Sequence, residues 1–312
     1  MNRWVILCGG GGKGRTQAGE LDALHGAGLL DGIKGIVGTS VGGINACLLG
    51  LGLAQGVGTK IMLDAWAAIK RDEDVYLPGL TELSKAPLQH PLDDLGLAKG
   101  FLAGPAPCST APLDDLARRI LGGMNTIGIE QVTGLKILVR ALNYDTHQVD
   151  TLFGDLTAMA LCTSAIEGVF PRRWGYGDGG AVDNAPIDVA LNEGADQILV
   201  VYCGPENPPA GQRPKVAVAD VQDSRPPSTG LKDALAVLEG ITQANEDLVD
   251  QAAARAEAQG VEIIHCFPTF DTGSALDFSP RDLLERGRVE AQRAIQEAIE
   301  KGWIPAPPAI PS

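Results

Sequence analysis

Short apolar runs alternate with longer segments of helical pattern along the first part of the chain. Residues 5–8 and 33–37 are short runs rich in aliphatic and β-branched side chains, and each is followed directly by glycine, which is typical of buried strands. Residues 17–28 and 41–53 come after them and have the length and composition of helices. This alternation predicts an α/β protein whose mostly parallel sheet is covered by helices on both faces.

Later segments interrupt this alternation. The chain has 312 residues, 45% of them hydrophobic, which is enough for one large core, and we expect a single domain over residues 1–304. Residues 78–112, rich in Pro, Gly and Leu, and the Pro-rich residues 205–230 are candidate lids or inserts, or passive surface excursions. Residues 231–259 predict a long helix, and 305–312 a Pro-rich, extended tail.

Charge and cysteine usage exclude several classes of protein. The net charge of −14 and the 4% aromatic content argue against nucleic acid as a partner and against more than transient contact with an anionic membrane. The six cysteines are dispersed without a C-x-x-C pair, as expected for reduced, buried thiols in a cytoplasmic protein. Residues 1–4 lead into a run of only four apolar residues, 5–8, before the first glycines, so no signal peptide is expected there.

Ser40 lies in the turn between the second predicted strand and the helix that follows it, within Gly38-Thr39-Ser40-Val41-Gly42. A Gly-x-Ser-x-Gly turn in that place is strained and lifts the serine Oγ clear of the sheet, as a nucleophile requires. The helix N-terminus would favour developing negative charge. Taken alone, the pentapeptide is equally typical of an ordinary glycine-rich turn in which Ser40 caps the helix.

The glycine run at residues 9–14 follows the first predicted strand and fits three functions. Gly9, Gly11 and Gly14 match the dinucleotide-binding pattern G-x-G-x-x-G, but no acid follows the second strand to bind a ribose. The same run nearly matches a phosphate-binding P-loop, except that Arg15 stands where that motif needs lysine. As a third function, the backbone N–H groups of glycines 9–12 form an oxyanion hole, which alone explains the serine turn that follows.

A serine nucleophile needs a base, and two kinds of candidate are present. Of the four histidines (His25, His90, His147 and His265), only His265 ends an apolar run, and none has a recognisable catalytic context. Asp178 lies in a glycine-rich segment, Asp178-Gly179-Gly180, where flexible backbone lets a carboxylate approach another segment closely. By itself, Asp-Gly is also a common surface turn.

Together these segments resemble the patatin-like phospholipase family. The resemblance rests on the glycine loop with its basic residue, on the serine turn and on the Asp-Gly-Gly segment, in this order, and extends to residues 163–171 and 184–187. It spans about residues 4–202 and, more weakly, residues 282–301. Its supporting motif positions are Lys13, Gly14, Gly38, Thr39, Val41, Gly42, Gly179 and Gly180.

The resemblance implies a three-layer α/β/α fold and a serine acyl hydrolase. Ser40 would be the nucleophile, Asp178 the general base, and Gly9, Gly10, Gly11 and Gly12 the oxyanion hole. The substrate would be a fatty acyl ester of a phospholipid or related lipid, cleaved through an acyl-enzyme without metal or cofactor. Leucines and a phenylalanine between residues 77 and 102 would line an acyl pocket or form a small separate core. A catalytically silent protein that binds lipid or a partner is the alternative, and a nucleotide-binding protein is the third.

Overall fold

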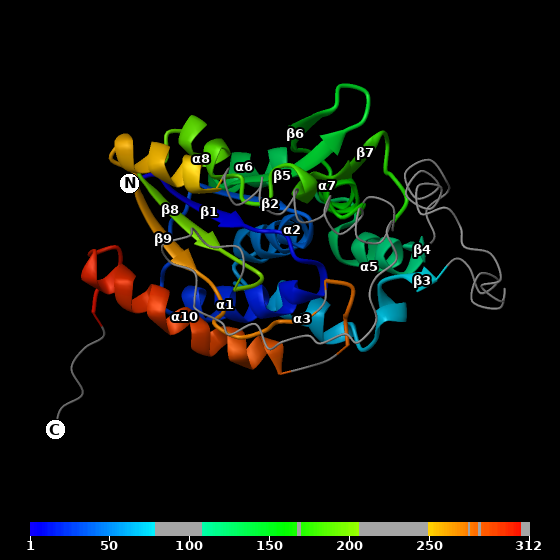
Figure 1. Ribbon diagram of the computed structural model, residues 1–312, viewed down its shortest axis with the longest axis horizontal. Helices are drawn as coiled ribbons and strands as arrows, with labels where there is room; N and C mark the ends of the chain where they lie inside the picture. Colours follow the sequence, from blue (N-terminus) through cyan, green and yellow to red (C-terminus); the bar gives the residue numbers. More distant parts are fainter. Residues whose placement is uncertain (79–107, 167–169, 206–248, 274, 280–281, 307–312) are drawn as a thin grey trace, which may run out of the picture.

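The computed structural model describes residues 1–78, 108–166, 170–205, 249–273, 275–279 and 282–306. A seven-stranded sheet forms its centre, in the order β6-β5-β2-β1-β8-β9, with β7 also paired to β5 (Figure 1). β1, β2, β5, β8 and β9 are parallel, and β6 and β7 run antiparallel to β5. The seven strands are β1 (Arg3–Leu7), β2 (Gly35–Thr39), β5 (Lys136–Asn143), β6 (Gln148–Leu152), β7 (Tyr176–Asp178), β8 (Gln197–Val201) and β9 (Glu262–Cys266).

Helices and short turns connect these strands. The longer helices are α1 (Gly14–Gly26), α2 (Val41–Ala54), α3 (Lys60–Ala68), α5 (Ala111–Leu121), α6 (Thr126–Thr133), α7 (Leu156–Thr163), α8 (Ile187–Asn192) and α10 (Leu283–Glu300). Single 3₁₀ turns are η1 (Gly11–Lys13), η2 (Asp72–Asp74) and η3 (Gly179–Ala181), and a two-stranded ribbon joins β3 (Leu77–Pro78) to β4 (Cys108–Ser109).

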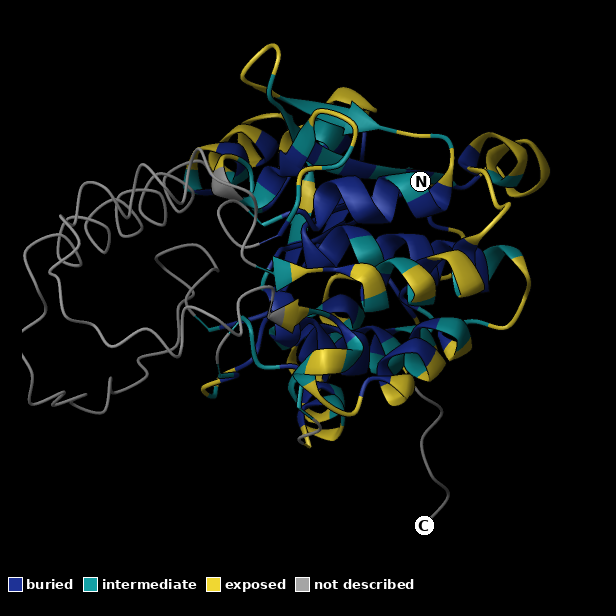
Figure 2. Cartoon of the chain, turned by 90° about the vertical axis from the view of Figure 1, so that its right-hand side faces the viewer, coloured by how far each residue is buried: buried dark blue, intermediate teal, exposed yellow. Residues whose placement is uncertain are grey.

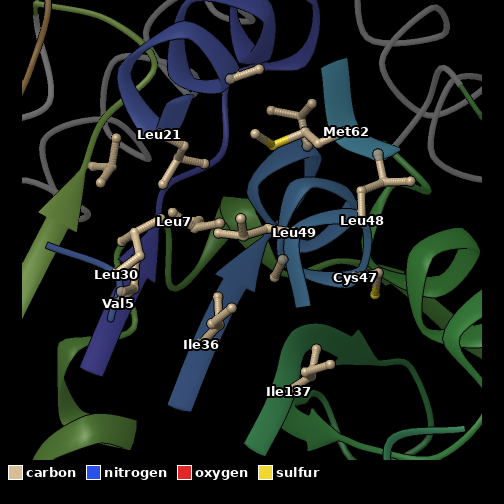
Figure 3. Packing of buried hydrophobic residues seen from close by; sticks show 14 of the residues in the cluster. Val5, Leu7, Leu21, Leu30, Ile36, Cys47, Leu48, Leu49, Met62 and Ile137 are labelled. Carbon is tan, nitrogen blue, oxygen red and sulfur yellow. The ribbon is translucent and has the colours of Figure 1, made fainter. Parts of the chain in front are cut away.

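The sheet is the middle of three layers, as expected. Alternate residues of β1 face opposite sides: Val5 and Leu7 pack with α1, α2 and α10, whereas Trp4 and Ile6 pack with α8 and the helical residues 249–258. Figure 1 shows these two sets of helices on opposite faces of the sheet, and Figure 3 shows the larger cluster from close by. The outer helices expose one side to solvent, while α2 is buried along most of its length (Figure 2). The prediction of a mostly parallel sheet covered on both faces is confirmed.

The predicted elements are present with shifted ends. The first strand starts earlier than its apolar run, because the buried Arg3 has partners for its guanidinium: it donates to the Gln197 side chain and to the main-chain oxygens of Leu29 and Trp303. β2 runs two residues further than expected, to Thr39, and α1 begins three residues earlier than expected, at Gly14, the last residue of the glycine run. Both shifts bring the glycine loop and Ser40 to the carboxyl ends of adjacent parallel strands, the edge at which α/β sheets bind ligands.

Several expectations fall largely outside the described residues. These are the two candidate lid segments, the helix predicted over 231–259 before residue 249, most of the tail, and the apolar set at 77–102 apart from Leu77, which is exposed. Five of the six cysteines are buried, and the sixth, Cys108, is partly exposed. Within the described part of the chain, no helix has both the length and the apolar character needed to cross a membrane.

Candidate active site

The serine turn has the strained geometry that its glycines indicate. Ser40 has φ 56° and ψ −132°, a left-handed conformation that a residue with a Cβ rarely adopts. A Cβ on Gly38 would lie 2.2 Å from the Gly42 oxygen, and one on Gly42 would lie 2.2 Å from the Leu7 oxygen. Only glycine therefore fits at either position. Ser40 stands at the N-cap position of α2, but its side chain makes no capping hydrogen bond, so an ordinary capping turn does not describe it.

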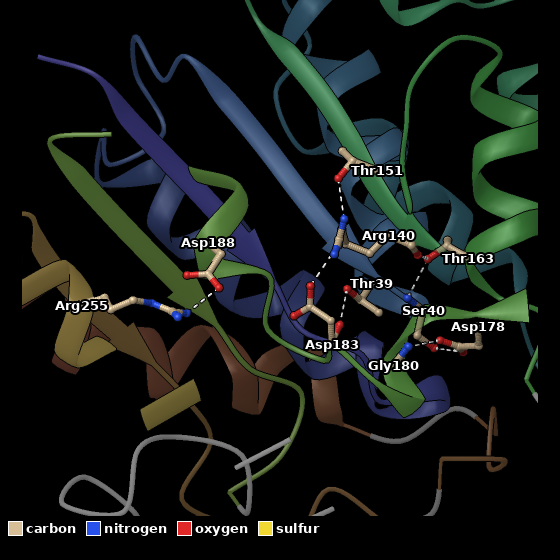
Figure 4. Close-up of polar contacts among 10 residues, drawn as sticks. All are labelled: Thr39, Ser40, Arg140, Thr151, Thr163, Asp178, Gly180, Asp183, Asp188 and Arg255. Carbon is tan, nitrogen blue, oxygen red and sulfur yellow. Dashed lines mark hydrogen bonds and ion pairs between the residues drawn. The ribbon is translucent and has the colours of Figure 1, made fainter. Parts of the chain in front are cut away.

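The Ser40 side chain instead contacts Asp178. Its Oγ donates a hydrogen bond of 2.6 Å to Asp178 Oδ2, and both residues are buried (Figure 4). Asp178 ends β7, which pairs with β5 at Ala141, and its other carboxylate oxygen accepts the Gly180 N–H at 2.8 Å. Asp178 is thus part of the sheet edge and not of a surface turn. The structure brings together two residues that lie 138 positions apart in the chain.

Thr163 holds the main chain of Ser40, a contact that sequence reasoning missed. The Ser40 N–H donates to Thr163 Oγ1 at 2.9 Å, and this hydroxyl donates in turn to the main-chain oxygen of Arg140 at 2.6 Å (Figure 4). Thr163 is fully buried at the end of α7. The strained turn is therefore fixed through its backbone, which leaves the Ser40 Oγ in contact with Asp178.

The glycine loop lies beside Ser40, and two of its four N–H groups are already hydrogen-bonded. The Gly9 N–H donates to Asn184 Oδ1 at 3.0 Å, and the Gly12 N–H donates to the Ala275 oxygen at 2.7 Å. Among the described residues, no hydrogen bond occupies the N–H groups of Gly10 and Gly11. Gly11 has φ 56° and lines the same cavity as Ser40. Two amides next to the serine are thus the ones open to an additional acceptor.

An apolar cavity extends from Ser40 between helices α2, α3, α5 and α7. Together with its open mouth it encloses about 740 Å³. Its walls are almost entirely aliphatic or aromatic, and Leu48, Trp66 and Leu121 are among them. Polar side chains contribute little besides Ser40 and Ser164. The exposed Leu77 is not among these lining residues, and the described wall of the cavity comes mainly from these four helices.

Comparison with known proteins assigns the family. A model described as "Patatin-like phospholipase" matches residues 5–191, more than half of the chain. The chain belongs to the patatin-like phospholipase family. Membership indicates lipid acyl hydrolase activity at the level of the family, and the resemblance seen in the sequence is thereby confirmed.

Similarity to individual proteins is low. A comparison with curated proteins finds no match. The crystal structure of VipD from Legionella pneumophila is 14% identical, with a TM-score of 0.41, over 95% of this chain and 67% of that one. The structure of the type III effector protein ExoU is 18% identical, with a TM-score of 0.39, over 95% of this chain and 53% of that one.

In this patatin-like protein Arg15 does not take the place of the P-loop lysine. Arg15, at the lysine position of the P-loop pattern, is buried and donates to the main-chain oxygen of Ile69 at 2.8 Å. Its guanidinium also stacks on the ring of Trp66, 5.4 Å from the ring centre, and burial lowers the pKa of Arg15. The side chain is thus used in packing α1 against α3 behind the cavity wall, and does not face the glycine loop as a phosphate ligand would.

The described histidines lie away from Ser40. His265 is on β9, three strands from β2, where its Nδ1 is hydrogen-bonded to Tyr202 Oη at 2.9 Å. Burial lowers the pKa of His265 to about 4. His147 is exposed in the turn between β5 and β6. The ring of His25 lies against Gly58, where an added Cβ would be 2.3 Å from its Nε2. His90 is outside the described residues.

Proposed function

We propose that this patatin-like protein is a serine acyl hydrolase with a Ser–Asp dyad, in which Ser40 is the nucleophile and Asp178 the general base. The observation that carries the proposal is the 2.6 Å hydrogen bond from Ser40 Oγ to Asp178 Oδ2 at the mouth of an apolar cavity. A carboxylate at that distance can take the hydroxyl proton directly. Family membership supports the same class of reaction.

The reaction takes place in two halves. Ser40 Oγ attacks the ester carbonyl carbon while Asp178 takes its proton, and the negative charge on the carbonyl oxygen is stabilised by the N–H groups of Gly10 and Gly11 and by the N-terminus of α2. The C–O bond to the alcohol breaks, and Asp178 returns the proton to the leaving oxygen. Water, deprotonated by Asp178, then attacks the acyl-enzyme, which releases the fatty acid and restores Ser40.

The substrate is a fatty acyl ester whose chain lies in the cavity. Its aliphatic walls between α2, α3, α5 and α7 favour an alkyl chain over a polar group, because each buried methylene contributes about 0.8 kcal/mol. The carbonyl would stand at the end where Ser40 and Gly11 meet. Of the predicted oxyanion glycines, we assign only Gly10 and Gly11 as donors to the oxyanion, because the N–H groups of Gly9 and Gly12 donate to other acceptors.

Hydrolysis of p-nitrophenyl esters, from butyrate to palmitate, tests this function. We expect turnover by the wild type and a loss of about 10⁴-fold or more in Ser40→Ala. Ser164→Ala is the matched control, because Ser164 also lines the cavity and is equally buried, and we expect it to keep activity within a few-fold. Turnover that survives in Ser40→Ala contradicts the proposal. Lipid binding without any turnover by the wild type would favour the catalytically silent alternative.

A further inference from the structure

Asn184 lies between the glycine loop and the loop that follows Asp178. Its Oδ1 accepts the Gly9 N–H at 3.0 Å, and its main-chain oxygen lies 3.4 Å from the same nitrogen. A Cβ on Gly9 would lie 2.4 Å from Asn184 Oδ1 and 2.9 Å from Ser40 Cβ. Gly9 is therefore enclosed between the Asn184 amide and the nucleophile, and it directly precedes Gly10 and Gly11.

The same amide oxygen is also next to the base. A Cβ on Gly180 would lie 3.1 Å from Asp178 Oδ1 and 3.2 Å from Asn184 Oδ1. The two side-chain oxygens are therefore both close to the Cα of Gly180. The Gly180 N–H is the group that holds the Asp178 carboxylate at 2.8 Å. One side-chain oxygen thus touches the glycine loop and lies beside the loop that orients Asp178.

Asp183 anchors the segment that carries Asn184. Its carboxylate accepts Arg140 Nε at 2.9 Å, and Arg140 donates further to Thr151 Oγ1 at 2.6 Å (Figure 4). The main-chain oxygen of Asp183 accepts Thr39 Oγ1, directly before Ser40, at 2.9 Å. The pKa of the Asp183 carboxyl is raised overall, because burial outweighs the opposite effect of Arg140. The loop is therefore held to β2 and β5 directly and to β6 through Arg140, and Asn184 contacts Gly9 from this anchored segment.

We propose that Asn184 is a positioning residue that holds the Gly9 N–H so that the amides of Gly10 and Gly11 face the oxyanion formed at Ser40. The inference rests on the proposed acyl hydrolase function and deepens it. Asn184 does not touch the reacting atoms; it acts through Gly9. Its contribution belongs to the transition state, because a displaced oxyanion donor weakens binding of the tetrahedral oxyanion more than binding of the ester.

A transition-state analogue separates this role from a merely structural one. The probe is an alkyl trifluoromethyl ketone, which gives a tetrahedral oxyanion on serine, and its affinity is measured by calorimetry so that the readout does not depend on turnover. In Asn184→Ala we expect kcat and the affinity for the ketone to fall together by about 10-fold, with KM for the ester unchanged within twofold. Asn125→Ala is the matched control, since Asn125 Oδ1 also accepts a backbone N–H, that of Ile127, far along the chain at the start of α6.

The isosteric Asn184→Asp keeps an oxygen acceptor for Gly9 but adds a negative charge beside Asp178. We expect its affinity for the ketone to return to within about threefold of wild type at high pH, while the acid limb of its pH–rate profile moves to higher pH because a like charge disfavours ionisation of the base.

Unchanged ketone affinity in Asn184→Ala overturns the role of Asn184 even where turnover depends on Ser40. A wild type that neither turns over esters nor binds the ketone overturns the hydrolase itself. A wild type that binds the ketone without turnover still tests Asn184 through the ketone affinity of its variants.

Discussion

Ser40–Asp178 and Tyr202–His265 are both buried hydrogen-bonded pairs at this sheet, and only the first has the surroundings of an active site. Ser40 Oγ donates to Asp178 at 2.6 Å, and Tyr202 Oη is hydrogen-bonded to His265 Nδ1 at 2.9 Å. Asp178 and His265 are almost equally buried, with 6% and 7% of their surface exposed. Histidine is the usual base of a serine hydrolase, so burial and a hydrogen bond do not by themselves identify the reactive pair.

The difference lies in what surrounds each pair. Ser40 is on a strained turn, faces an apolar cavity and has the glycine loop beside it. His265 is in the regular strand β9, its ring stacks on Tyr202, and burial holds its pKa at about 4. The histidine therefore stays neutral and enclosed. Access for a substrate and donors for an oxyanion set the two pairs apart, and substitutions at each pair test this interpretation.

The largest effect on turnover is expected at Asp178, and His265 serves as the comparison. Asp178→Asn removes the base while keeping its shape, and we expect turnover of a p-nitrophenyl ester to fall by about 10⁴-fold, as when the orienting carboxylate of a serine triad is replaced. His265→Gln should leave turnover within about threefold, because His265 is three strands away from β2. Both are measured at matched folded concentration, with thermal unfolding as the control. The reverse result would make the histidine the base.

The sequence was sufficient to propose this dyad because the requirements on Ser40 are local. Gly38 and Gly42 are needed because the backbone around Ser40 leaves no room for a Cβ at either position. The signal for the turn therefore lies within five consecutive residues. Asp178 was proposed from its glycine neighbours together with the family resemblance, because Asp-Gly alone is also typical of a surface turn. Its place became clear only when β7, three residues long, paired antiparallel with β5. Strands that short carry too few residues for a periodic pattern.

The cavity and the supporting contacts could not be read from the sequence. The cavity wall combines α2, α3, α5 and α7, and no local pattern says which apolar residues of four helices will meet. Arg15 looked like part of a phosphate loop but packs on Trp66, because tertiary packing and not the loop motif decides where a long side chain goes. Thr163 and Asn184 each hold a backbone N–H of a segment far along the chain.

An intermediate effect is expected in the cavity beside Ser40, which neither Tyr202 nor His265 lines. Ala117→Leu adds bulk to the wall formed by α5, and we expect kcat/KM for the palmitate ester to fall by about 10-fold or more while the value for butyrate changes less than threefold. The matched control is Ala252→Leu, which overpacks the cluster that contains Tyr202 at a cost of about 1–3 kcal/mol in stability. It should not alter the chain-length profile. Equal loss for both esters in Ala117→Leu would place the acyl chain elsewhere.

The smallest effect on turnover is expected from titration of His265. Its titration should instead lower the free energy of unfolding at acid pH. Its pKa is about 4 in the folded protein and about 6.5 in the unfolded chain, so between these values the unfolded state binds more protons. The stability contributed by the neutral ring is complete above pH 6.5 and is lost as the pH falls toward 4, by about 3 kcal/mol in total. Buried carboxyl groups such as Glu20, whose pKa is raised by burial, titrate alike in the wild type and in His265→Gln, so their contribution cancels in the difference. The difference in unfolding free energy between wild type and His265→Gln, measured with urea, should therefore shrink on acidification. A constant difference would mean that the ring has the same pKa in the folded and the unfolded chain.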